Sequence, residues 1–188
     1  MATKTRKQTG SDRPRPLSLR GRLERVRIFL CDVDGVLTDG SVFIGAEKET
    51  KRFNIRDGLG LVFLRHVGIK TGWISSRPSA ATQLRATELK IDYLEQTKHG
   101  KIPQVEKILA AAGLNWRHVC YVGDDVVDLG VMARAGLAVS VGDGIAEVRA
   151  AAHYVTKEPG GHGAIREVVE MILKAQNKWD GIVAEYSA

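Results

Sequence analysis

Two carboxylates stand two positions apart directly after an apolar, β-branched stretch at residues 26–31. Asp32 and Asp34 are followed by a glycine and, further on, by an Asp39-Gly40 pair. A carboxylate at the end of a buried strand costs free energy unless it is solvated, paired or bound to a metal ion. Asp and Gly are common turn residues, so a polar turn explains any one of these residues alone. The whole pattern after a predicted strand instead favours a catalytic or metal-binding loop.

A second acidic cluster, GDDVVD at 123–128, follows another apolar stretch. Hard cations such as Mg²⁺ prefer oxygen ligands, only a few of them charged, and Asp32 and Asp124 together could supply these. The alternative is helix capping, because an Asp in the first turn interacts favourably with the helix dipole. We assign Asp125 mostly to capping or to an indirect role at the site. Asp128 stays open between the two interpretations.

Two further segments carry groups suited to binding a phosphate. Ser75-Ser76-Arg77 lies between a predicted strand and a helix that Pro78 can begin. Hydroxyl and backbone N–H groups at a helix N-terminus form an anion site, and the Arg77 guanidinium is a planar two-point donor. Capping of the helix by Ser75 is the alternative. Lys101 starts another predicted helix, where the dipole disfavours a cation, and this hints at a function for its charge.

The segments between these residues predict an alternation of strands and helices. Strands are predicted at 26–31, 69–74, 93–94, 118–122 and 137–141, helices at 57–67, 78–89, 100–112, 126–135 and 163–174, and a hairpin at 41–55. This order predicts an α/β, Rossmann-like, doubly wound and mainly parallel sheet with helices on both faces. In such sheets ligands bind beyond the carboxyl ends of the strands, where Asp32, Ser75 and Asp124 would meet.

Taken in chain order, these segments resemble the four motifs of the haloacid dehalogenase-like phosphatases. DVDGVLTDG, the strand ending in Ser75, Lys101 and GDDVVD follow the family's order within residues 28–128. The resemblance implies that Asp32 is a nucleophile forming an aspartyl-phosphate. It implies that Asp34 is the acid and base, with its backbone carbonyl on Mg²⁺. It further implies that Ser75 and Lys101 hold the phosphoryl oxygens, and that Asp124 completes the metal site with Asp32.

The spacing of the motifs leaves no room for a cap domain between Gly40 and Ser75, or between Ser75 and Lys101. This layout resembles the 3-deoxy-D-manno-octulosonate 8-phosphate (KDO 8-phosphate) phosphatases over nearly all of 26–180. The segments that carry the likeness are FNIRDG at 53–58, SSR at 75–77, YVGDD at 121–125 and GGHGAIRE at 160–167. The resemblance implies a homotetramer in which the hairpin builds a barrel and a neighbouring subunit closes the active site. It also implies a role in lipopolysaccharide precursor synthesis.

Arg77 bears on the choice of sugar phosphate. Relatives that act on nine-carbon sialic-type sugar phosphates tend to carry an acidic residue there, so Arg77 favours the eight-carbon sugar acid, whose carboxylate it could pair with. By the same resemblance, Arg56, Asp57 and Gly58 are candidate substrate-binding residues, with helix capping by Arg56 and Asp57 as the alternative. His162 stands where members of the group often have arginine in a GGRG segment. The glycines at 160–163 are alternatively a flexible connection into the last predicted helix.

Two other functions stay open at this point. One is a sialic-type nine-carbon sugar phosphate phosphatase, against which Arg77 argues. The other is a non-catalytic, phosphatase-like regulatory domain. The complete set Asp32, Asp34, Lys101 and Asp124 argues against it, because a pure binding module has no need of all four.

The composition is that of one soluble globular domain, with 44% hydrophobic and 27% charged residues in 188. No apolar run approaches the roughly 20 residues of a membrane span, so we expect a cytoplasmic protein without membrane association. Cys31 and Cys120 fall in apolar runs and are expected to be buried free thiols.

The net charge of +6 is concentrated near the N-terminus. We divide the chain into a mobile basic tail at 1–20, a phosphatase domain at 21–180 and a C-terminal tail at 181–188. Such a tail could bind nucleic acid, but it lacks neighbouring aromatic residues for stacking on bases, which argues against this partner.

Overall fold

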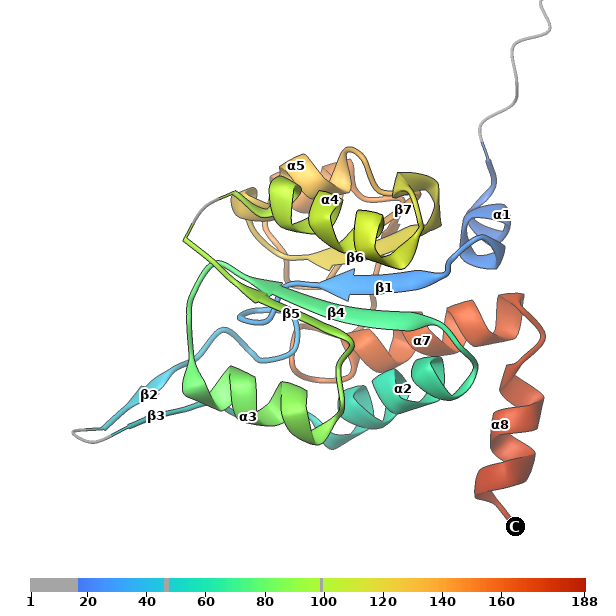
Figure 1. Cartoon of the computed structure of the whole chain (residues 1–188), viewed down its shortest axis with the longest axis horizontal. Helices are drawn as coiled ribbons and strands as arrows, with labels where there is room; N and C mark the ends of the chain where they lie inside the picture. Colours follow the sequence, from blue (N-terminus) through green and yellow to red (C-terminus); the bar gives the residue numbers. More distant parts are fainter. Residues whose placement is uncertain (1–16, 46–47, 99) are drawn as a thin grey trace, which may run out of the picture.

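The computed structural model describes residues 17–45, 48–98 and 100–188. In this part of the chain a six-stranded sheet has the strand order β5-β4-β1-β6-β7-β8 (Figure 1). All of its pairings are parallel, which confirms the predicted doubly wound α/β fold. The strands are β1 (Ile28–Cys31), β4 (Lys70–Ser75), β5 (Tyr93–Gln96), β6 (Val119–Gly123), β7 (Leu137–Ser140) and β8 (Tyr154–Val155).

Helices cover both faces of the sheet, as Figure 1 shows. One layer contains α1 (Leu19–Glu24), α2 (Ile55–His66), α3 (Ala80–Glu88), α7 (Ala164–Ala175) and α8 (Trp179–Tyr186). The other contains α4 (Lys101–Ala112), α5 (Leu129–Met132) and α6 (Ala146–Ala151). Successive side chains of a strand point to opposite faces. Phe29 and Cys31 of β1 therefore pack in the first layer's core, and Ile28 and Leu30 in the second.

Local capping explains where the structure departs from the predicted helix bounds. Helix α3 begins after Ser79, whose hydroxyl accepts from Thr82 N, so Pro78 precedes the cap and does not start the helix. The single helix predicted at 126–135 is instead a 3₁₀ turn at Val126–Asp128 followed by the short α5. The prediction failed there because the Asp128 side chain bonds the backbone N–H groups ahead of it, which tightens the turn.

Helices occupy parts of both predicted tails. Helix α8 occupies most of 181–188, which corrects the prediction of a C-terminal tail. Ile182 is buried, and the Phe63 ring of α2 contacts Trp179 and Tyr186 of α8 edge-on, with centroids 6.1 and 4.9 Å apart. At the other end α1 begins at Leu19, inside the predicted tail, and residues 1–16 lie outside the described part.

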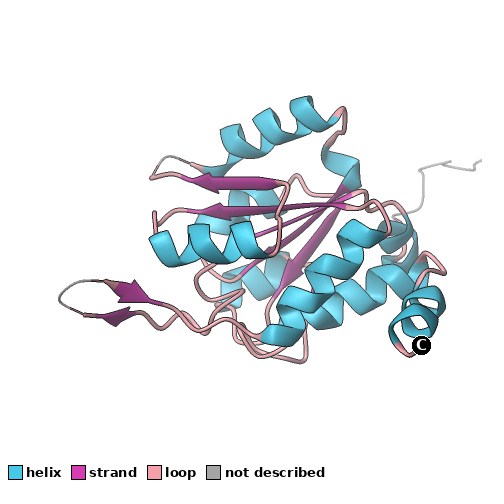
Figure 2. Cartoon of the chain, turned by 60° about the horizontal axis from the view of Figure 1, so that its bottom comes forward, coloured by secondary structure: helices cyan, strands magenta, loops and turns pink. Residues whose placement is uncertain are grey.

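The predicted hairpin is present, with shorter strands than expected. Strand β2 (Phe43–Ile44) pairs with β3 (Glu49–Thr50), and the hairpin projects from the body of the domain (Figure 2). Within the described residues, only this hairpin and α2 lie between β1 and β4, and only α3 and β5 between β4 and α4. No cap domain is inserted in either interval. In the same residues, no helix is both long and apolar enough to cross a membrane.

Asp57 joins α2 to α7 through its carboxylate. The side chain is 1% exposed and accepts from Gly163 N at 3.2 Å and from Arg166 N at 2.8 Å. Both N–H groups belong to the first turn of α7 or its cap, where no helical acceptor exists. Burial raises the pKa of Asp57, and these two hydrogen bonds oppose that shift. The carboxylate therefore holds together two helices in the same layer.

Replacing Asp57 with alanine should lower the free energy of unfolding by about 1–2 kcal/mol, because two N–H donors of α7 lose their acceptor. Urea denaturation measures the loss. The exposed Asp180, replaced in the same way, is the control and should change stability by less than about 0.5 kcal/mol. Unchanged stability together with weaker substrate binding would contradict the capping role and favour the predicted substrate contact.

Candidate active site

Three strand ends bring polar side chains to one edge of the sheet. Asp32 follows β1 and donates its backbone N–H to Val122 O of β6 at 3.0 Å. Ser75 ends β4, Asp124 follows β6, and β1 pairs with both strands in parallel register. Oxygens of Asp32, Asp124 and Asp128 lie within 4.8 Å of one another. The structure thus confirms that the predicted strand ends meet, and it shows that Asp128 lies beside Asp32 and Asp124.

Lys101 lies against two of these carboxylates. Its ammonium nitrogen is 3.1 Å from Asp32 Oδ1 and 2.7 Å from Asp128 Oδ1, and the residue is 3% exposed. Burial alone would lower the pKa of Lys101, but the two carboxylates outweigh burial and raise it. Burial raises the pKa of Asp32 to about 6, with Lys101 opposing the shift and Asp128 adding to it. A cation buried at the start of α4 is tolerated because both partners are anionic.

Asp128 fixes the position of Lys101 and of the loop after β6. Its Oδ1 accepts from Lys101 and from the Tyr121 hydroxyl at 2.6 Å. Its Oδ2 accepts from the backbone N–H groups of Asp124 at 3.0 Å and Asp125 at 3.3 Å. Asp128 is fully buried, so these four donors replace its hydration. The sequence left Asp128 open between capping and a role at the site, and the structure shows that Asp128 both caps the turn and pairs with Lys101.

Asp124 has an unsatisfied oxygen beside the other carboxylates. Its Oδ1 is enclosed and has no hydrogen-bond partner among the described residues. Burial raises the pKa of Asp124 to about 8, and the charges of Asp32 and Asp128 add to the shift. A Cβ at Gly35, where φ is +86°, would lie 2.1 Å from Asp124 Oδ2, so only glycine fits between the acidic loops. Crowded anionic oxygens of this kind suit a hard divalent cation.

Asp125 caps the turn after β6, as predicted. Its carboxylate accepts from the backbone N–H of Val126 at 2.6 Å.

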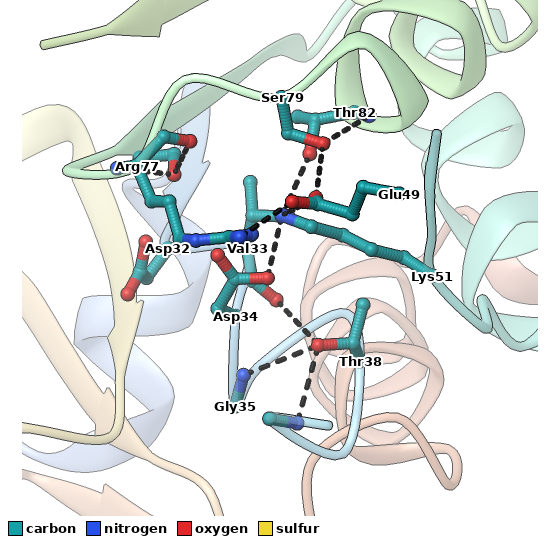
Figure 3. Close-up of polar contacts among 12 residues, drawn as sticks. Asp32, Val33, Asp34, Gly35, Thr38, Glu49, Lys51, Arg77, Ser79 and Thr82 are labelled. Carbon is teal, nitrogen blue, oxygen red and sulfur yellow. Dashed lines mark hydrogen bonds and ion pairs between the residues drawn. The ribbon is translucent and has the colours of Figure 1, made fainter. Parts of the chain in front are cut away.

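The loop after β1 folds back on itself around Thr38 (Figure 3). Thr38 is fully buried, and its Oγ1 accepts from Gly35 N at 3.3 Å and Gly40 N at 3.2 Å. Asp34 Oδ1 lies 2.7 Å from the ammonium nitrogen of Lys51, which forms an ion pair. Lys51 stands in the predicted hairpin, and nothing in the sequence marks it as a partner of Asp34.

Ser75 and Arg77 occupy the turn after β4. The buried Ser75 hydroxyl accepts from Arg77 N and donates to Arg77 O, both at 3.0 Å. The Arg77 guanidinium forms an ion pair with Glu49 of the hairpin, and Ser79 donates to the same carboxylate at 2.7 Å (Figure 3). Glu49 is a second hairpin residue at the site that sequence reasoning missed.

The three remaining candidates lie in other surroundings. Asp57 caps α7. Gly58 faces α3, where an added Cβ would meet the end of the Arg85 side chain at 2.5 Å. Arg56 is exposed and lines a cleft of ≈ 500 Å³ together with His162. No contact described for these three residues reaches the acidic cluster, and their role in substrate binding stays a prediction.

Gly160 and Gly161 pack directly on the loop that carries Asp34. A Cβ at Gly160 would lie 1.8 Å from Gly35 O, and Gly161 N donates to Val36 O at 3.0 Å. The flexible connection considered for 160–163 is therefore wrong at these two positions, because close backbone approach requires glycine there.

Comparison with known proteins assigns the chain to a family. The model of the haloacid dehalogenase-like hydrolases matches residues 75–168. A 3-deoxy-D-manno-octulosonate 8-phosphate phosphatase from Yersinia pestis is 40% identical over 161 residues, which cover 85% of this chain and 86% of that protein. The chain belongs to the haloacid dehalogenase-like hydrolases. It is an enzyme of that family, which argues against a non-catalytic regulatory domain.

Solved structures of this hydrolase family match the fold closely. The Moraxella catarrhalis phosphatase in complex with magnesium, phosphate and KDO superposes with a TM-score of 0.86 at 39% identity, covering 89% of this chain and 97% of that one. The cobalt-bound phosphatase from Haemophilus influenzae has a TM-score of 0.81 at 37% identity, covering 84% and 92%. These relatives were crystallised with divalent metal ions, and this chain has an acidic cluster that could bind one.

At pH 8 in EDTA, Asp124→Asn should be more stable than the wild type by about 1–3 kcal/mol, because it removes a buried charge that forms no ion pair within the described residues and is repelled by Asp32 and Asp128. The raised pKa fixes the sign. The charge opposes folding above the unfolded pKa of about 4, and the cost is complete above the folded pKa of about 8. The gain should therefore vanish near pH 4.

Thermal unfolding at both pH values checks this prediction. Mg²⁺ should raise the Tm of the wild type at pH 8 and leave that of Asp124→Asn unchanged. A variant less stable than the wild type in EDTA at pH 8 would contradict the crowding of charge described here.

Proposed function

We propose that the protein is a Mg²⁺-dependent phosphatase that hydrolyses KDO 8-phosphate to KDO and inorganic phosphate, a step of lipopolysaccharide precursor synthesis. The observation that carries the proposal is the grouping of Asp32, Lys101 and Asp128 beside the unsatisfied Asp124. The substrate is supported by relatives that are 37–40% identical over 85% of this chain and are named for it.

The residues at the sheet edge fit a magnesium ion. Asp32 and Asp124 would hold it through carboxylate oxygens, and Asp34 through its backbone carbonyl. The enclosed Asp124 Oδ1, which lacks a partner in the described chain, is the feature that such an ion would satisfy. Bound there, it would neutralise negative charge on the phosphoryl group.

In the first step an Asp32 oxygen attacks phosphorus, and the bond from phosphorus to the ester oxygen breaks. The electron pair stays on that oxygen, which takes a proton from the Asp34 carboxyl and leaves as the sugar hydroxyl. Lys101 lies 3.1 Å from Asp32 and can contact the phosphoryl oxygens as well. The Ser75 hydroxyl would contact those oxygens in place of its bond to Arg77 O, together with N–H groups of its turn.

In the second step Asp34, now a carboxylate, takes a proton from water. The water oxygen attacks phosphorus, the bond to Asp32 breaks, and its electron pair restores the Asp32 carboxylate with release of inorganic phosphate. Both steps need the same positions of Asp32 and Asp34, which the loop around Thr38 maintains.

Arg77 is the residue proposed to bind the sugar carboxylate, and Arg56, Asp57 and Gly58 remain weaker candidates. In the structure Arg77 pairs with Glu49, so a carboxylate already lies where the substrate's would bind. An arginine suits a planar carboxylate through two parallel hydrogen bonds. Nine-carbon sialic-type acids carry a carboxylate too, so the choice of the eight-carbon sugar acid rests on the relatives that are named for it.

A homotetramer is part of the same proposal. The hairpin projects into solvent, with Phe43 61% and Ile44 82% exposed. Apolar side chains at the end of a projecting hairpin are typical of a contact between subunits. A neighbouring copy could therefore cover an active site that has no cap of its own.

Phosphate release from a panel of sugar phosphates with Mg²⁺ tests the proposed reaction. KDO 8-phosphate should show the highest kcat/KM, ahead of a nine-carbon sialic-type 9-phosphate and of glucose 6-phosphate. Asp32→Asn should lower kcat at least about 10³-fold with every substrate, because an amide cannot replace the nucleophile. Asp180→Asn is the control. Full activity of Asp32→Asn would overturn the mechanism, and preference for another sugar would overturn only the substrate.

Arg77→Met should raise KM for KDO 8-phosphate about 10- to 100-fold, because the sugar carboxylate loses its partner. The KM for glucose 6-phosphate, which has no carboxylate, should change less than about 3-fold. Steady-state kinetics with both substrates checks the difference. Equal changes in the two KM values would show that Arg77 does not recognise the carboxylate.

A further inference from the structure

Lys51 is a buried cation that the reaction described above does not use. It stands directly after β3, and its side chain is 0% exposed. The ammonium nitrogen lies 2.7 Å from Asp34 Oδ1, 3.2 Å from Thr82 Oγ1 and 3.8 Å from Glu49 Oε1. Figure 3 shows the side chain running from the hairpin to a point between these three residues.

Burying an ammonium group is costly unless oxygens surround it. The nearest oxygen belongs to Asp34, and Thr82 on α3 is itself fully buried. The lysine therefore connects the loop after β1 to the base of the hairpin and to α3. An apolar side chain would fill the same space, but it would remove the ion pair that Asp34 forms within the described part of the chain.

The contact engages only one side of the Asp34 carboxylate. Both oxygens are enclosed and neither has a partner in hydrogen-bond geometry among the described residues. Oδ1 forms the ion pair with Lys51, whereas Oδ2 forms no ion pair within the same residues. A carboxylate can rotate about its terminal bond, so a fixed Oδ1 also fixes Oδ2. Oδ2 is thus the oxygen left to exchange a proton with a reacting group.

We propose that Lys51 is a positioning residue, which holds Asp34 Oδ1 so that Oδ2 faces the bridging oxygen of the phosphate ester. This inference rests on the proposed function, in which Asp34 is the acid and base. Lys51, at the base of the hairpin, thereby acts on the active site of its own subunit. The loss of Lys51 should then harm proton transfer to the leaving group more than phosphate binding or nucleophilic attack.

Leaving groups of different basicity separate these effects. The oxygen of a sugar alcohol needs a proton as the P–O bond breaks, whereas 4-nitrophenolate is a stable anion and leaves without one. The ratio kcat/KM reports the steps up to transfer of the phosphoryl group to Asp32. It therefore excludes the later attack of water, in which Asp34 acts with every substrate.

Lys51→Met should lower kcat/KM for KDO 8-phosphate about 10- to 100-fold. The same variant should lower kcat/KM for 4-nitrophenyl phosphate less than about 3-fold. Lys107→Met, an exposed lysine of α4 outside the proposed subunit contact, is the control and should leave both values unchanged. Equal losses with both substrates, or no loss with either, would overturn the proposal.

Asp34→Asn, measured with the same two substrates, separates this proposal from the proposed function. Asp34→Asn should show the same selective loss in kcat/KM, and to a larger extent. If Asp34→Asn affects both substrates equally, the acid role of Asp34 is wrong. If Asp34→Asn is selective and Lys51→Met is not, only the role of Lys51 is wrong. Should the wild type prefer another sugar phosphate, that ester replaces KDO 8-phosphate in the comparison.

Two milder variants keep the test valid if Lys51→Met does not fold, which circular dichroism would reveal. Thr82→Val removes the hydroxyl that holds the ammonium from the side of α3, and it should cause a smaller loss with the same substrate selectivity. Lys51→Arg retains the charge and should recover part of the activity with the sugar phosphate. A loss in Thr82→Val that is equal for both substrates would overturn the proposal.

Discussion

The crowding of three carboxylates where β1 and β6 end is the interaction on which the rest of the site depends. Asp32, Asp124 and Asp128 bring oxygens within 4.8 Å of one another, and Lys101 offsets one of their charges directly. Burial raises the pKa of Asp32 to about 6 and that of Asp124 to about 8, and the charge of Asp128 adds to both shifts. Carboxylates whose ionisation is disfavoured in this way favour the binding of a cation, which offsets their charge.

The surrounding backbone prevents the carboxylates from relieving this repulsion by moving apart. Tyr121 and two N–H groups hold Asp128, and glycines at 35 and 160 let the neighbouring loops touch. Preorganised charge of this kind lowers the barrier of phosphoryl transfer, because little rearrangement is needed during the reaction. The buried carboxylates lower the free energy of unfolding, and the two hydrophobic cores that pack on the sheet raise it.

Much of this could be predicted from the sequence, because the main signals are local. Asp32, Ser75 and Asp124 each end an apolar stretch, and parallel strands place such ends along one edge. Lys51, Glu49 and Tyr121 were missed because their partners are brought near only by folding. Helix α8 was missed too, since its contacts with Phe63 join segments more than a hundred residues apart.

The central claim is that the phosphoryl group passes through Asp32. The most direct test uses Asp34→Asn with 4-nitrophenyl phosphate and Mg²⁺, because this ester needs no acid and the variant lacks the base for the second step. After an acid quench and proteolysis, mass spectrometry should find a phosphoryl group on the peptide that contains Asp32, carried by that side chain. A phosphoryl group on another residue, or continued turnover without label on Asp32, would contradict the account.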